Sequence, residues 1–449
     1  MNLLRRVVYA SLAAGLFLTV SHAVNSHYLY LKIYRHEPER LADRPLGYVP
    51  VDPGKPLRDG RSGLLYVRVL GDLPRFTIER LIEVLARRKL AGLDLSAQSS
   101  FSDSACAALA RLPSLHYLRL DGTAVTDAGL SSLGEAHQLR ALGLAKGDSD
   151  AGLDTVSRFG ELEVLNLADA SISDAGLARL AGLPLRRLEL GSSITDAGLQ
   201  ALTPLHKLRH LDLGRTRVTD AGVATLTAFP HLETLLAGRL FTSRGLMELA
   251  ELPALQRSIR RLDLSGTRVD DRAFGALALF KNLEELALSG TAAGDSAVRR
   301  LARVPSLRAL ELSDTLMTIT GLEELQALPH LEVLSISLSD HLSVADLRAL
   351  RRLHQLRLLI VDGRAIGGPQ LRRLMAKLEA LERSLRGASG AREDTADFIA
   401  RLGPALPAHG LSRLDDFAED PGALPADATG IDHVISAPGA AFKAGGVRT

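Results

Sequence analysis

Residues 208–230 read LRHLDLGRTRVTDAGVATLTAFP, and this stretch carries a pattern that runs through most of the chain. It joins a segment of the form L-x-x-L-x-L to the tripeptide Asp-Ala-Gly. A fixed period of two dozen residues predicts a solenoid, in which each repeat packs on its neighbours. The tripeptide occurs at intervals of 22 to 24 residues, starting at Asp127, Asp150, Asp174, Asp196 and Asp220.

The first half of the stretch predicts a short strand. Leu211 and Leu213 are two residues apart, so they point to one side, while His210 and Asp212 point to the other. The hydroxyl of Thr216 can bond to backbone groups where the chain leaves the strand. Other repeats have a threonine at the same place: Thr123, Thr267, Thr291 and Thr315.

The second half predicts a short helix. Thr219 or Asp220 suits the N-cap position, and an acidic residue in the first turn suits the helix dipole. We expect Gly222 to let the helix approach its neighbour closely, and Pro230 to end the helix. Apolar residues recur at spacings of three on roughly one face of this helix: Val223, Leu226 and Phe229.

The pattern resembles the leucine-rich repeat family over about two-thirds of the chain. The resemblance implies an α/β solenoid, a horseshoe with a parallel β-sheet on its concave side and helices on its convex side. One repeat buries too few apolar side chains to offset its ordering entropy, so stacking is required. About twelve repeats are expected, beginning at Leu90, Leu115, Leu139, Leu162, Leu185, Leu208, Leu232, Ile259, Leu283, Leu307, Leu331 and Leu356.

The ending I/V-T-D-x-G-L is similar to that of the cysteine-containing subfamily, which is known from F-box substrate receptors. That resemblance implies a binding role, with a substrate-recognition subunit of a ubiquitin-ligase-like complex or a secreted effector as the alternative function. The subfamily's cysteines are replaced by threonine in this sequence, and no F-box precedes the repeats. Both departures favour a plain binding module over a ligase receptor.

The start of the chain predicts export. Arg5 and Arg6 precede an apolar run at residues 7–20, and the small-x-small site Ser21-His22-Ala23 follows. A full membrane span needs roughly 20 apolar residues, but tyrosines just beyond the run favour a membrane interface. Residues 1–24 are therefore predicted to be a signal peptide or an N-terminal membrane anchor. The protein would be secreted or lie in the cell envelope, either in the periplasm or anchored in the inner membrane facing outward.

The remaining boundaries follow from composition. Residues 25–62 are predicted to be a linker, and 63–89 an N-terminal cap with a strand near 64–69 and a helix at 77–89. The array is expected at 90–386, closed by a C-terminal capping helix that starts at Pro369. Residues 387–449 carry nine acidic and five basic side chains and are predicted to be a mostly disordered tail, with a short amphipathic piece at 394–402.

The outward positions of the strands are the candidate partner-binding sites. They would form a mixed-charge strip that recognises an unknown protein, with Tyr117 as a contact anchor. The alternative is that acidic residues there only solvate the sheet. The candidate residues are Tyr117, Arg119, Arg187, Glu189, His210, Asp212, Arg261, Asp263, Glu285 and Glu311.

Other chemistry is disfavoured by composition. A net charge of +2 does not indicate nucleic-acid binding. Cys106 is the only cysteine, in a convex-helix pattern typical of a small buried side chain. The histidines recur at repeat joints without metal-ligand spacing. The sequence therefore predicts a monomeric, non-catalytic protein with no cofactor, metal or nucleic acid, and membrane contact only through its N-terminal segment.

One repeat is irregular. The interval between Leu232 and Ile259 is 27 residues, whereas the others are 23 to 25. A binding insertion or a local bulge near residues 235–240 would account for it, and we expect the bulge.

Overall fold

The computed structural model describes residues 18–21, 28–34, 65–70, 82, 90–96, 98–339 and 341–385. The chain divides into two compact units. Unit 1 comprises Met1–Val218 and Thr225–Leu232, and unit 2 comprises Thr219–Ala224 and Glu233–Thr449.

Within unit 1, short strands alternate with short helices, as the repeat pattern predicts. From β3 to β9 each strand pairs parallel with the next, whereas β2 pairs antiparallel with both β1 and β3. The strands are β1 (Leu18–Ser21), β2 (Tyr28–Tyr34), β3 (Leu65–Leu70), β4 (Leu90–Asp94), β5 (Tyr117–Arg119), β6 (Ala141–Gly143), β7 (Val164–Asn166), β8 (Arg187–Glu189) and β9 (His210–Asp212).

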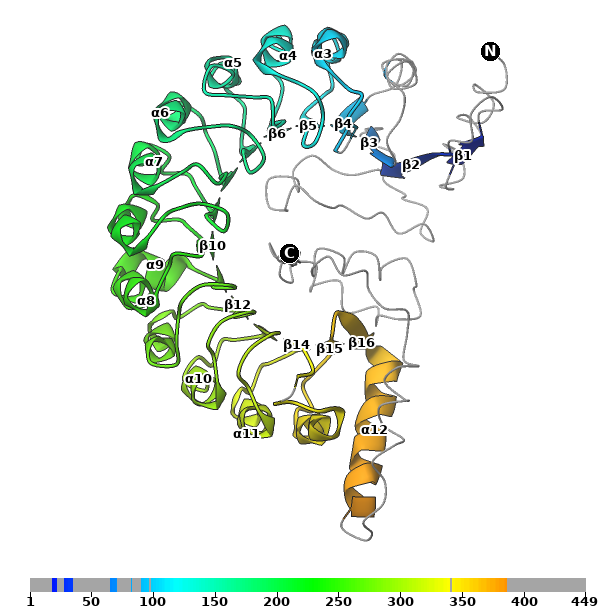
Figure 1. Cartoon of the computed structure of the whole chain (residues 1–449), viewed down its shortest axis with the longest axis vertical. Coiled ribbons are helices and arrows are strands. Elements are labelled where there is room, and N and C mark those ends of the chain that lie inside the picture. Colours follow the sequence, from blue (N-terminus) through cyan, green and yellow to red (C-terminus); the bar gives the residue numbers. More distant parts are fainter. Residues whose placement is uncertain are drawn as a thin grey trace, which may run out of the picture. The chain divides into compact units, whose positions relative to one another are not determined.

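The helices of unit 1 lie on the outer side of its strands (Figure 1). The 3-10 helix η3 (Asp220–Ala228) has residues in both units. Its three-residue turn matches the spacing of three between Val223, Leu226 and Phe229. The other helices are α3 (Asp103–Ala110), α4 (Asp127–Ser132), α5 (Leu153–Val156), α6 (Asp174–Leu177), η2 (Ala178–Leu180) and α7 (Asp196–Ala201).

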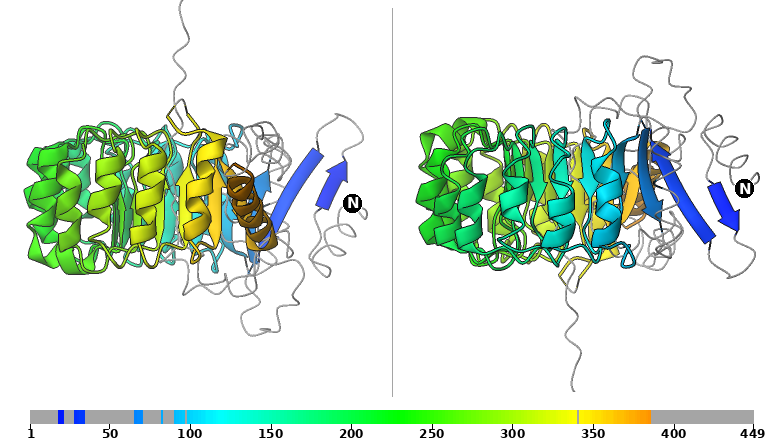
Figure 2. Two further views of the ribbon diagram at one scale, coloured as in Figure 1. Left: turned by 90° about the horizontal axis from the view of Figure 1, so that it is seen from below. Right: turned by 90° about the horizontal axis from the view of Figure 1, so that it is seen from above.

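Unit 2 continues the alternation of parallel strands and helices from β10 to β15. Its helices stand side by side, green to orange in Figure 2. The strands are β10 (Thr234–Leu236), β11 (Arg261–Asp263), β12 (Glu285–Ala287), β13 (Ala309–Leu312), β14 (Val333–Ile336), β15 (Leu358–Val361) and β16 (Arg364–Gly367). The helices are α8 (Ser243–Ala250), α9 (Pro253–Ser258), η4 (Ala273–Leu279), α10 (Asp295–Leu301), α11 (Ile319–Glu324), η5 (Leu325–Ala327), η6 (Val344–Arg352) and α12 (Gly368–Leu385).

The core of each unit lies between strands and helices. Leu211 on β9 is fully buried, and so are Leu286 and Leu288 at the corresponding places around β12. Removing such side chains from water stabilises each repeat by about 1.5–3 kcal/mol per leucine. The periodic leucines of the sequence are therefore confirmed as the buried layer of the solenoid.

The threonines that follow the strands bond to the backbone where the chain leaves each strand. The hydroxyl of Thr216 donates to the carbonyl oxygen of Leu213 at 2.8 Å. Its counterparts in four other repeats donate in the same way to the leucine three residues earlier, which confirms the expected backbone bond: Thr123, Thr267, Thr291 and Thr315.

The C-terminal helix is confirmed as α12, which begins at Gly368, one residue before Pro369. The hairpin before it was not predicted. β15 and β16 pair antiparallel through Asp362 and Gly363, whose φ angles are 50° and 73°. Two positive φ angles are required by a type I′ turn, and Asp-Gly is a preferred sequence for it. This dipeptide was the signal in the sequence that could have revealed the hairpin.

The long interval has a different cause from the one expected. β10 pairs with β11 residue for residue, with Thr234 opposite Arg261 and Leu236 opposite Asp263, so the strand has no bulge. The extra residues form helix α9, which starts at Pro253 and packs beside α8. The expectation of a bulge was wrong, because proline at the first turn of a helix starts a new element there.

The predictions for the two ends fall mainly outside the described residues. The strand expected near 64–69 is confirmed as β3, which pairs parallel with β4. Only Ile82 of the helix expected at 77–89 is described, as a buried helical residue. Strand β1 lies within the predicted signal or anchor, and β2 lies within the span 25–62 assigned to a linker. The predicted tail at 387–449 lies outside the described residues.

Candidate functional site

A bridge between successive repeats explains the aspartate of the Asp-Ala-Gly motif. Asp174 is the first residue of α6, and Thr195 is the N-cap of α7 in the next repeat. Thr195 donates its N–H and its hydroxyl to the two carboxylate oxygens of Asp174, at 2.8 and 2.6 Å. The same inter-repeat bridge joins Asp103 to Thr126, Asp127 to Ser149, Asp150 to Ser173, Asp220 to Thr242 and Asp295 to Thr318.

The choice of N-cap that the sequence left open is settled by this geometry. The threonine is the cap, because Thr219 accepts the N–H of Ala221 at 3.2 Å, as Thr195 accepts that of Ala197 at 3.3 Å. The aspartate occupies the first helical position, where its negative charge faces the next repeat and suits the helix dipole. The aspartate that follows the cap therefore starts its own helix and also accepts hydrogen bonds from the next repeat.

The glycine of the motif makes room for this bridge. A methyl group on Gly129 would lie 2.5 Å from Oδ1 of Asp103, and one on Gly198 would overlap Oδ1 of Asp174. No larger residue fits unless the aspartate of the previous repeat moves. The expected close approach is confirmed at these glycines, and its cause is a carboxylate rather than a helix backbone.

The concave face of each unit is defined here as the strand side opposite the buried leucines. It carries the third and fifth positions of L-x-x-L-x-L, where all ten candidate residues lie. In unit 1, Arg187 lies opposite His210 and Glu189 lies opposite Asp212, because β8 and β9 are in register. The structure thus brings these four together. Tyr117 and Arg119 lie on β5, with β6 and β7 between them and β8.

Two of the unit 1 candidates are less accessible than expected. Arg187 and His210 are buried, whereas Glu189, Asp212, Tyr117 and Arg119 are half-buried. Burial raises the pKa of the Glu189 carboxyl, against the opposing effect of Arg187. The mixed-charge strip therefore includes buried as well as half-buried residues. Neighbouring repeats are only one strand spacing apart, so long side chains shield one another.

In unit 2, two candidates pair with each other. Arg261 on β11 donates from Nε and Nη2 to the two carboxylate oxygens of Glu285 on β12, at 2.5 and 2.9 Å. The side chains of Arg261 and Glu285 are 15% and 16% exposed. A two-pronged bond of this kind fixes the orientation of both groups. The pair presents a preorganised, mixed-charge spot on the concave face.

The remaining unit 2 candidates are buried. Asp263 accepts the N–H of Ser265 at 2.8 Å, and Glu311 accepts the hydroxyl of Ser289 at 2.6 Å. Burial raises the pKa of Asp263, and it raises that of Glu311 to about 7, with the nearby charges of Asp263 and Asp314 adding to the effect at Glu311. Glu311 is therefore partly neutral near pH 7. Asp263 and Glu311 are therefore poorly accessible in this structure, and their role as partner contacts stays a prediction.

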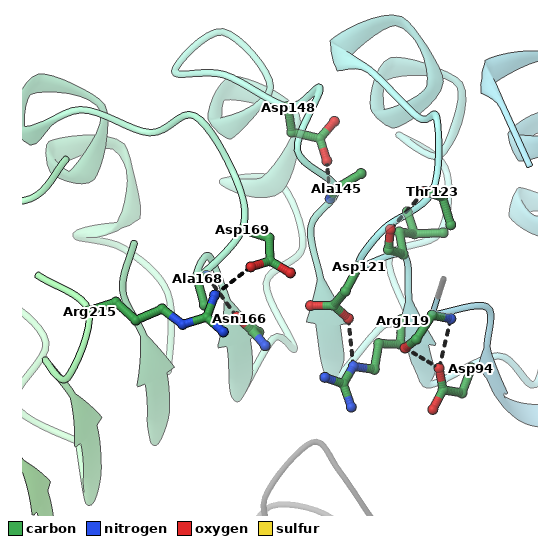
Figure 3. Close-up of polar contacts among 12 residues, drawn as sticks. Asp94, Arg119, Asp121, Thr123, Ala145, Asp148, Asn166, Ala168, Asp169 and Arg215 are labelled. Atoms are coloured by element: carbon green, nitrogen blue, oxygen red, sulfur yellow. Dashed lines mark hydrogen bonds and ion pairs between the residues drawn. The ribbon is translucent and has the colours of Figure 1, made fainter. Parts of the chain in front are cut away.

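Several fifth-position residues have a local structural role that the sequence analysis missed. Asp212 accepts the N–H of Gly214 at 2.7 Å, and Asn166 accepts that of Ala168 at 2.8 Å (Figure 3). Asp94 accepts the N–H of Ser96 in the same way. A carboxylate or amide at this place therefore closes the turn after the strand, as short polar side chains commonly do. This explains why acidic residues dominate the position.

The repeats themselves match a known family. The family model described as "Leucine Rich repeat" matches residues 111–134 and 205–226, which include β5, β9 and the bridging residues Thr126, Asp127 and Asp220. Two repeats of the chain match this family, and the chain has the fold of a leucine-rich repeat solenoid. The likeness of these repeats to the cysteine-containing subfamily remains a resemblance of the motif alone.

Two solved leucine-rich repeat structures are among those similar to this one. An internalin (inlF) from Listeria monocytogenes is 21% identical, with a TM-score of 0.44, and the alignment covers 67% of this chain and 86% of that chain. An internalin C2 (inlC2) from the same organism is 24% identical, with a TM-score of 0.34, covering 47% of this chain and 84% of that one. No curated protein matches the sequence.

Two ion pairs of this chain were not foreseen. Arg119 pairs with Asp121 at 2.5 Å, and Arg215 pairs with Asp169 at 2.6 Å (Figure 3). Asp169 and Arg215 are 46 residues apart, which is two repeat lengths. Comparing residues at multiples of the period could have suggested the second pair. The signal for the first was the spacing of two between Arg119 and Asp121, because such residues point to the same side of an extended segment.

Asp148 is a buried acid two residues before Asp150, at the place where the other Asp-Ala-Gly repeats have valine or isoleucine. It is 0% exposed, and its Oδ2 accepts the N–H of Ala145 at 2.7 Å (Figure 3). Its Oδ1 is buried, and no described residue bonds to it. Burial raises the pKa of Asp148 to about 7, and the charges of Asp127 and Asp103 add to the effect. Asp148 is therefore partly protonated near pH 7, as Glu311 is.

The thiol of Cys106 and the ring of His206 lie in structural surroundings. Cys106 is buried as expected, and burial raises the pKa of its thiol to about 12, so it is a poor nucleophile. His206 contacts the carbonyl oxygen of Ala228 at 3.2 Å. Within the described ranges, no group of three His, Cys, Asp or Glu side chains could hold a metal ion. Over the same ranges, every helix is too short or too polar to cross a membrane.

The concave face of unit 2 also carries an apolar cluster. It runs from β12 to β15 and consists of residues at the third and fifth strand positions. The exposed fractions of these side chains are only 1–4%, and Ala365 of β16 packs against them. We call this cluster the apolar concave strip; its members are Ala287, Ala309, Val333, Leu358 and Ile360.

Proposed function

We propose that this chain is an exported, non-catalytic scaffold that binds a protein partner through the concave faces of its repeats. The observation that carries the proposal is the contrast between the two sides of the repeats. The inter-repeat bridges recur almost unchanged, whereas the concave residues differ from strand to strand. Variable side chains on a rigid, regular support are what a recognition surface requires.

The chemistry of the concave face favours a partner with a mixed polar surface. In unit 2 the Arg261–Glu285 pair is partly exposed and held by its own hydrogen bonds. A preorganised pair loses little side-chain entropy when a partner adds further hydrogen bonds. In unit 1 the half-buried Glu189, Asp212 and Tyr117 offer two carboxylates and an aromatic ring.

The non-catalytic part of the proposal rests on the kind of fold and on the inert thiol. Glu311 is the concave group whose pKa of about 7 would suit general acid–base chemistry. Turnover of any substrate that disappears in a Glu311→Gln variant would overturn this part. The alternative role as a receptor in a ubiquitin-ligase-like complex stays a prediction of the sequence.

Export is proposed from the basic and apolar residues at the start of the chain, Arg5 and Arg6 followed by 7–20. Mass determination of the mature N-terminus, combined with membrane fractionation, distinguishes a cleaved signal from a retained anchor. A protein found in the cytoplasm with Met1 intact would contradict the localisation.

A charge-swap experiment tests the binding surface. The double variant Arg261→Glu/Glu285→Arg keeps an ion pair on the concave face but inverts its polarity. The matched control is Arg244→Glu/Glu248→Arg, which inverts the pair at 2.7 Å on helix α8. Each full-length variant is used to capture partners from envelope and secreted fractions. We expect the concave swap to weaken capture of a partner roughly tenfold or more, and the helix swap to leave it unchanged. Equal capture by both variants would contradict a role for this part of the concave face.

A further inference from the structure

Arginine–glutamate pairs join successive repeats of unit 2. Arg299 on α10 donates to Glu324 on α11 at 3.2 Å, and the two residues are 25 positions apart. An arginine of this kind is therefore neutralised by a carboxylate about one repeat further along the chain. Two more pairs follow the same rule at 24 positions: Arg260 with Glu284, and Arg308 with Glu332.

This alternation of charge fails at the C-terminal end of unit 2. Helix α11 packs against η6, and η6 packs against α12, which is orange in Figure 1. The position directly after a buried leucine is held by Glu323 on α11, Arg348 on η6 and Arg372 on α12. The last two helices therefore carry arginine at corresponding places, where the preceding helix carries an acid.

Four arginines at this end have no carboxylate partner among the described residues. Arg372 and Arg373 are exposed and Arg348 is half-buried, and none of these three side chains bonds to another described residue. Arg352 is also exposed, and it donates to the neutral amide oxygen of Gln326 at 3.2 Å. We call Arg348, Arg352, Arg372 and Arg373 the C-terminal basic patch.

The surrounding sequence does not compensate for this charge. Residues 341–385 contain nine basic and four acidic side chains, a net charge of +5, whereas the whole chain has +2. Asp346 accepts the N–H and the hydroxyl of Ser343, and Asp362 accepts the N–H of Leu338. These two acids are thus held by neutral groups of their own loops, and a positive potential remains at this end of unit 2.

We propose that the C-terminal basic patch binds a carboxylate-rich segment of a protein partner, which supplies the acids that a further repeat would have supplied. Packed helices lie about 8–10 Å apart, and alternate side chains of an extended segment lie about 7 Å apart. An acidic segment that runs across η6 and α12 can therefore reach arginines on both. Each guanidinium can bond a carboxylate through two N–H groups. This surface lies on helices, not on the concave face, so the proposal goes beyond the proposed function.

Other anionic partners match the patch less well. Binding to a membrane surface requires exposed apolar side chains beside the basic ones, but Leu371, Leu374 and Leu378 of α12 are buried. Binding of single-stranded nucleic acid relies on aromatic side chains that stack on the bases, and residues 341–385 contain no Phe, Tyr or Trp. A run of Asp and Glu side chains needs neither feature.

Fluorescence anisotropy of a labelled oligoglutamate peptide, titrated with the full-length chain at low ionic strength, tests the patch. The triple variant Arg352→Glu/Arg372→Glu/Arg373→Glu reverses three exposed charges, and we expect its affinity for the peptide to fall roughly tenfold or more. The matched control makes the same change in net charge at exposed arginines elsewhere, and its affinity should change less than about twofold. This control is Arg111→Glu/Arg158→Glu/Arg239→Glu.

A charge-conserving variant separates binding from folding. Arg352→Lys/Arg372→Lys/Arg373→Lys keeps the positive charge but loses the two-pronged geometry, so binding should weaken by only about threefold. Circular dichroism should show that all three variants are folded. The concave variant Arg261→Glu/Glu285→Arg should bind the peptide as the unsubstituted chain does, so failure of this proposal and failure of the proposed function are distinguishable.

Several results would overturn the proposal. Absence of peptide binding by the unsubstituted chain would do so, and an equal loss of affinity in the Glu variant and its control would show an effect of net charge alone. Tighter binding of phosphatidylglycerol vesicles or of duplex DNA than of the peptide would assign the patch to a lipid surface or to nucleic acid. Self-association that is lost in the Glu variant, in place of peptide binding, would assign it to a second copy of this chain.

Discussion

The inter-repeat bridges, formed by an aspartate and the threonine or serine that it bonds in the next repeat, vary little along the chain; we call them the helix-side rim. The concave face of the same repeats varies from strand to strand. On the rim, the bridge from Asp174 to Thr195 recurs with the same two hydrogen bonds in other repeats. On the concave face, the position of Asp212 in β9 is taken by Ala287 in β12 and by Ile360 in β15. Features that every repeat shares hold repeats together, and features that change are available for recognition.

The difference also separates two kinds of acidic residue. Rim aspartates accept two hydrogen bonds from the next repeat, so their charge is satisfied. Concave and strand-exit acids such as Glu311 and Asp148 each have a buried oxygen that no described residue bonds. Such atoms lower stability, because they have lost water without gaining a full set of partners. Acids on the rim therefore stabilise the solenoid, whereas these two destabilise it.

The largest effect on stability is expected from a substitution in the buried leucine layer, which lies between the strands and the helices. Leu211→Asp would bury an unpaired charge at a fully buried site on β9, and should unfold several neighbouring repeats. We expect a loss of more than ~4 kcal/mol, measured by urea denaturation followed by circular dichroism. Leu211→Ala is the control, at about 2–5 kcal/mol. A stable Leu211→Asp protein would contradict a dry leucine layer.

Gly198→Ala tests the steric pairing of the rim. The added methyl group would overlap Oδ1 of Asp174 and lie 2.8 Å from Cγ2 of Ile194, so we expect a loss of about 2–3 kcal/mol. The matched control is Gly182→Ala, where no atom lies within 4 Å of the added group and stability should barely change. Adding Asp174→Ala to Gly198→Ala should cost less than the sum of the two single losses. Strict additivity would disprove the pairing.

Removing one bridge is expected to have a somewhat smaller effect. Asp174→Ala eliminates two charge-assisted hydrogen bonds to Thr195 and should lower the free energy of unfolding by about 1.5–3 kcal/mol. This exceeds the ~1 kcal/mol expected from loss of a helix cap alone. Thermal melting of the full-length chain measures the difference. A loss no greater than that of a simple cap would mean that the contact between repeats contributes little.

Asp148→Asn should stabilise the fold, by about 1–3 kcal/mol at pH 8, because it removes a buried charge but keeps an acceptor for the N–H of Ala145. The folded chain holds the Asp148 proton up to a pKa of about 7, whereas an unfolded aspartate releases it near pH 3.9. Stability contributed by this group is thus present below pH 4 and lost as pH rises to 7. The gain over the unsubstituted chain should shrink steadily from pH 8 to pH 5 in urea titrations. A gain independent of pH would show that the acid is not the cause.

The smallest effect is expected at an exposed ion pair. Asp169→Ala removes the ion pair with Arg215. The side chains of Asp169 and Arg215 are 44% and 57% exposed. Surface pairs contribute about 0–1 kcal/mol, so the melting temperature should change little. A loss of stability as large as that of Asp174→Ala would contradict the distinction between stabilising inter-repeat bridges and weak surface ion pairs.

The repeat architecture could be predicted because its signals are local. Leu211 and Leu213 alternate with polar residues, Thr216 follows at the strand exit, and Thr219 precedes a helix, all within a dozen residues. The candidate site was predicted only in part. The candidates lie on the concave face of the strands, but the burial of Asp263 and Glu311 was not foreseen. Depth of burial depends on what neighbouring repeats place alongside, which one repeat does not reveal.

Read alone, the sequence determined the period, the buried leucines and the alternation of strand and helix, because hydrophobic spacing selects secondary structure residue by residue. Only the tertiary structure decided the partner of each rim aspartate, the reason for each motif glycine, the neutral acid at Asp148 and the apolar strip. These depend on contacts between side chains about one repeat length apart, and such contacts form only when successive coils stack.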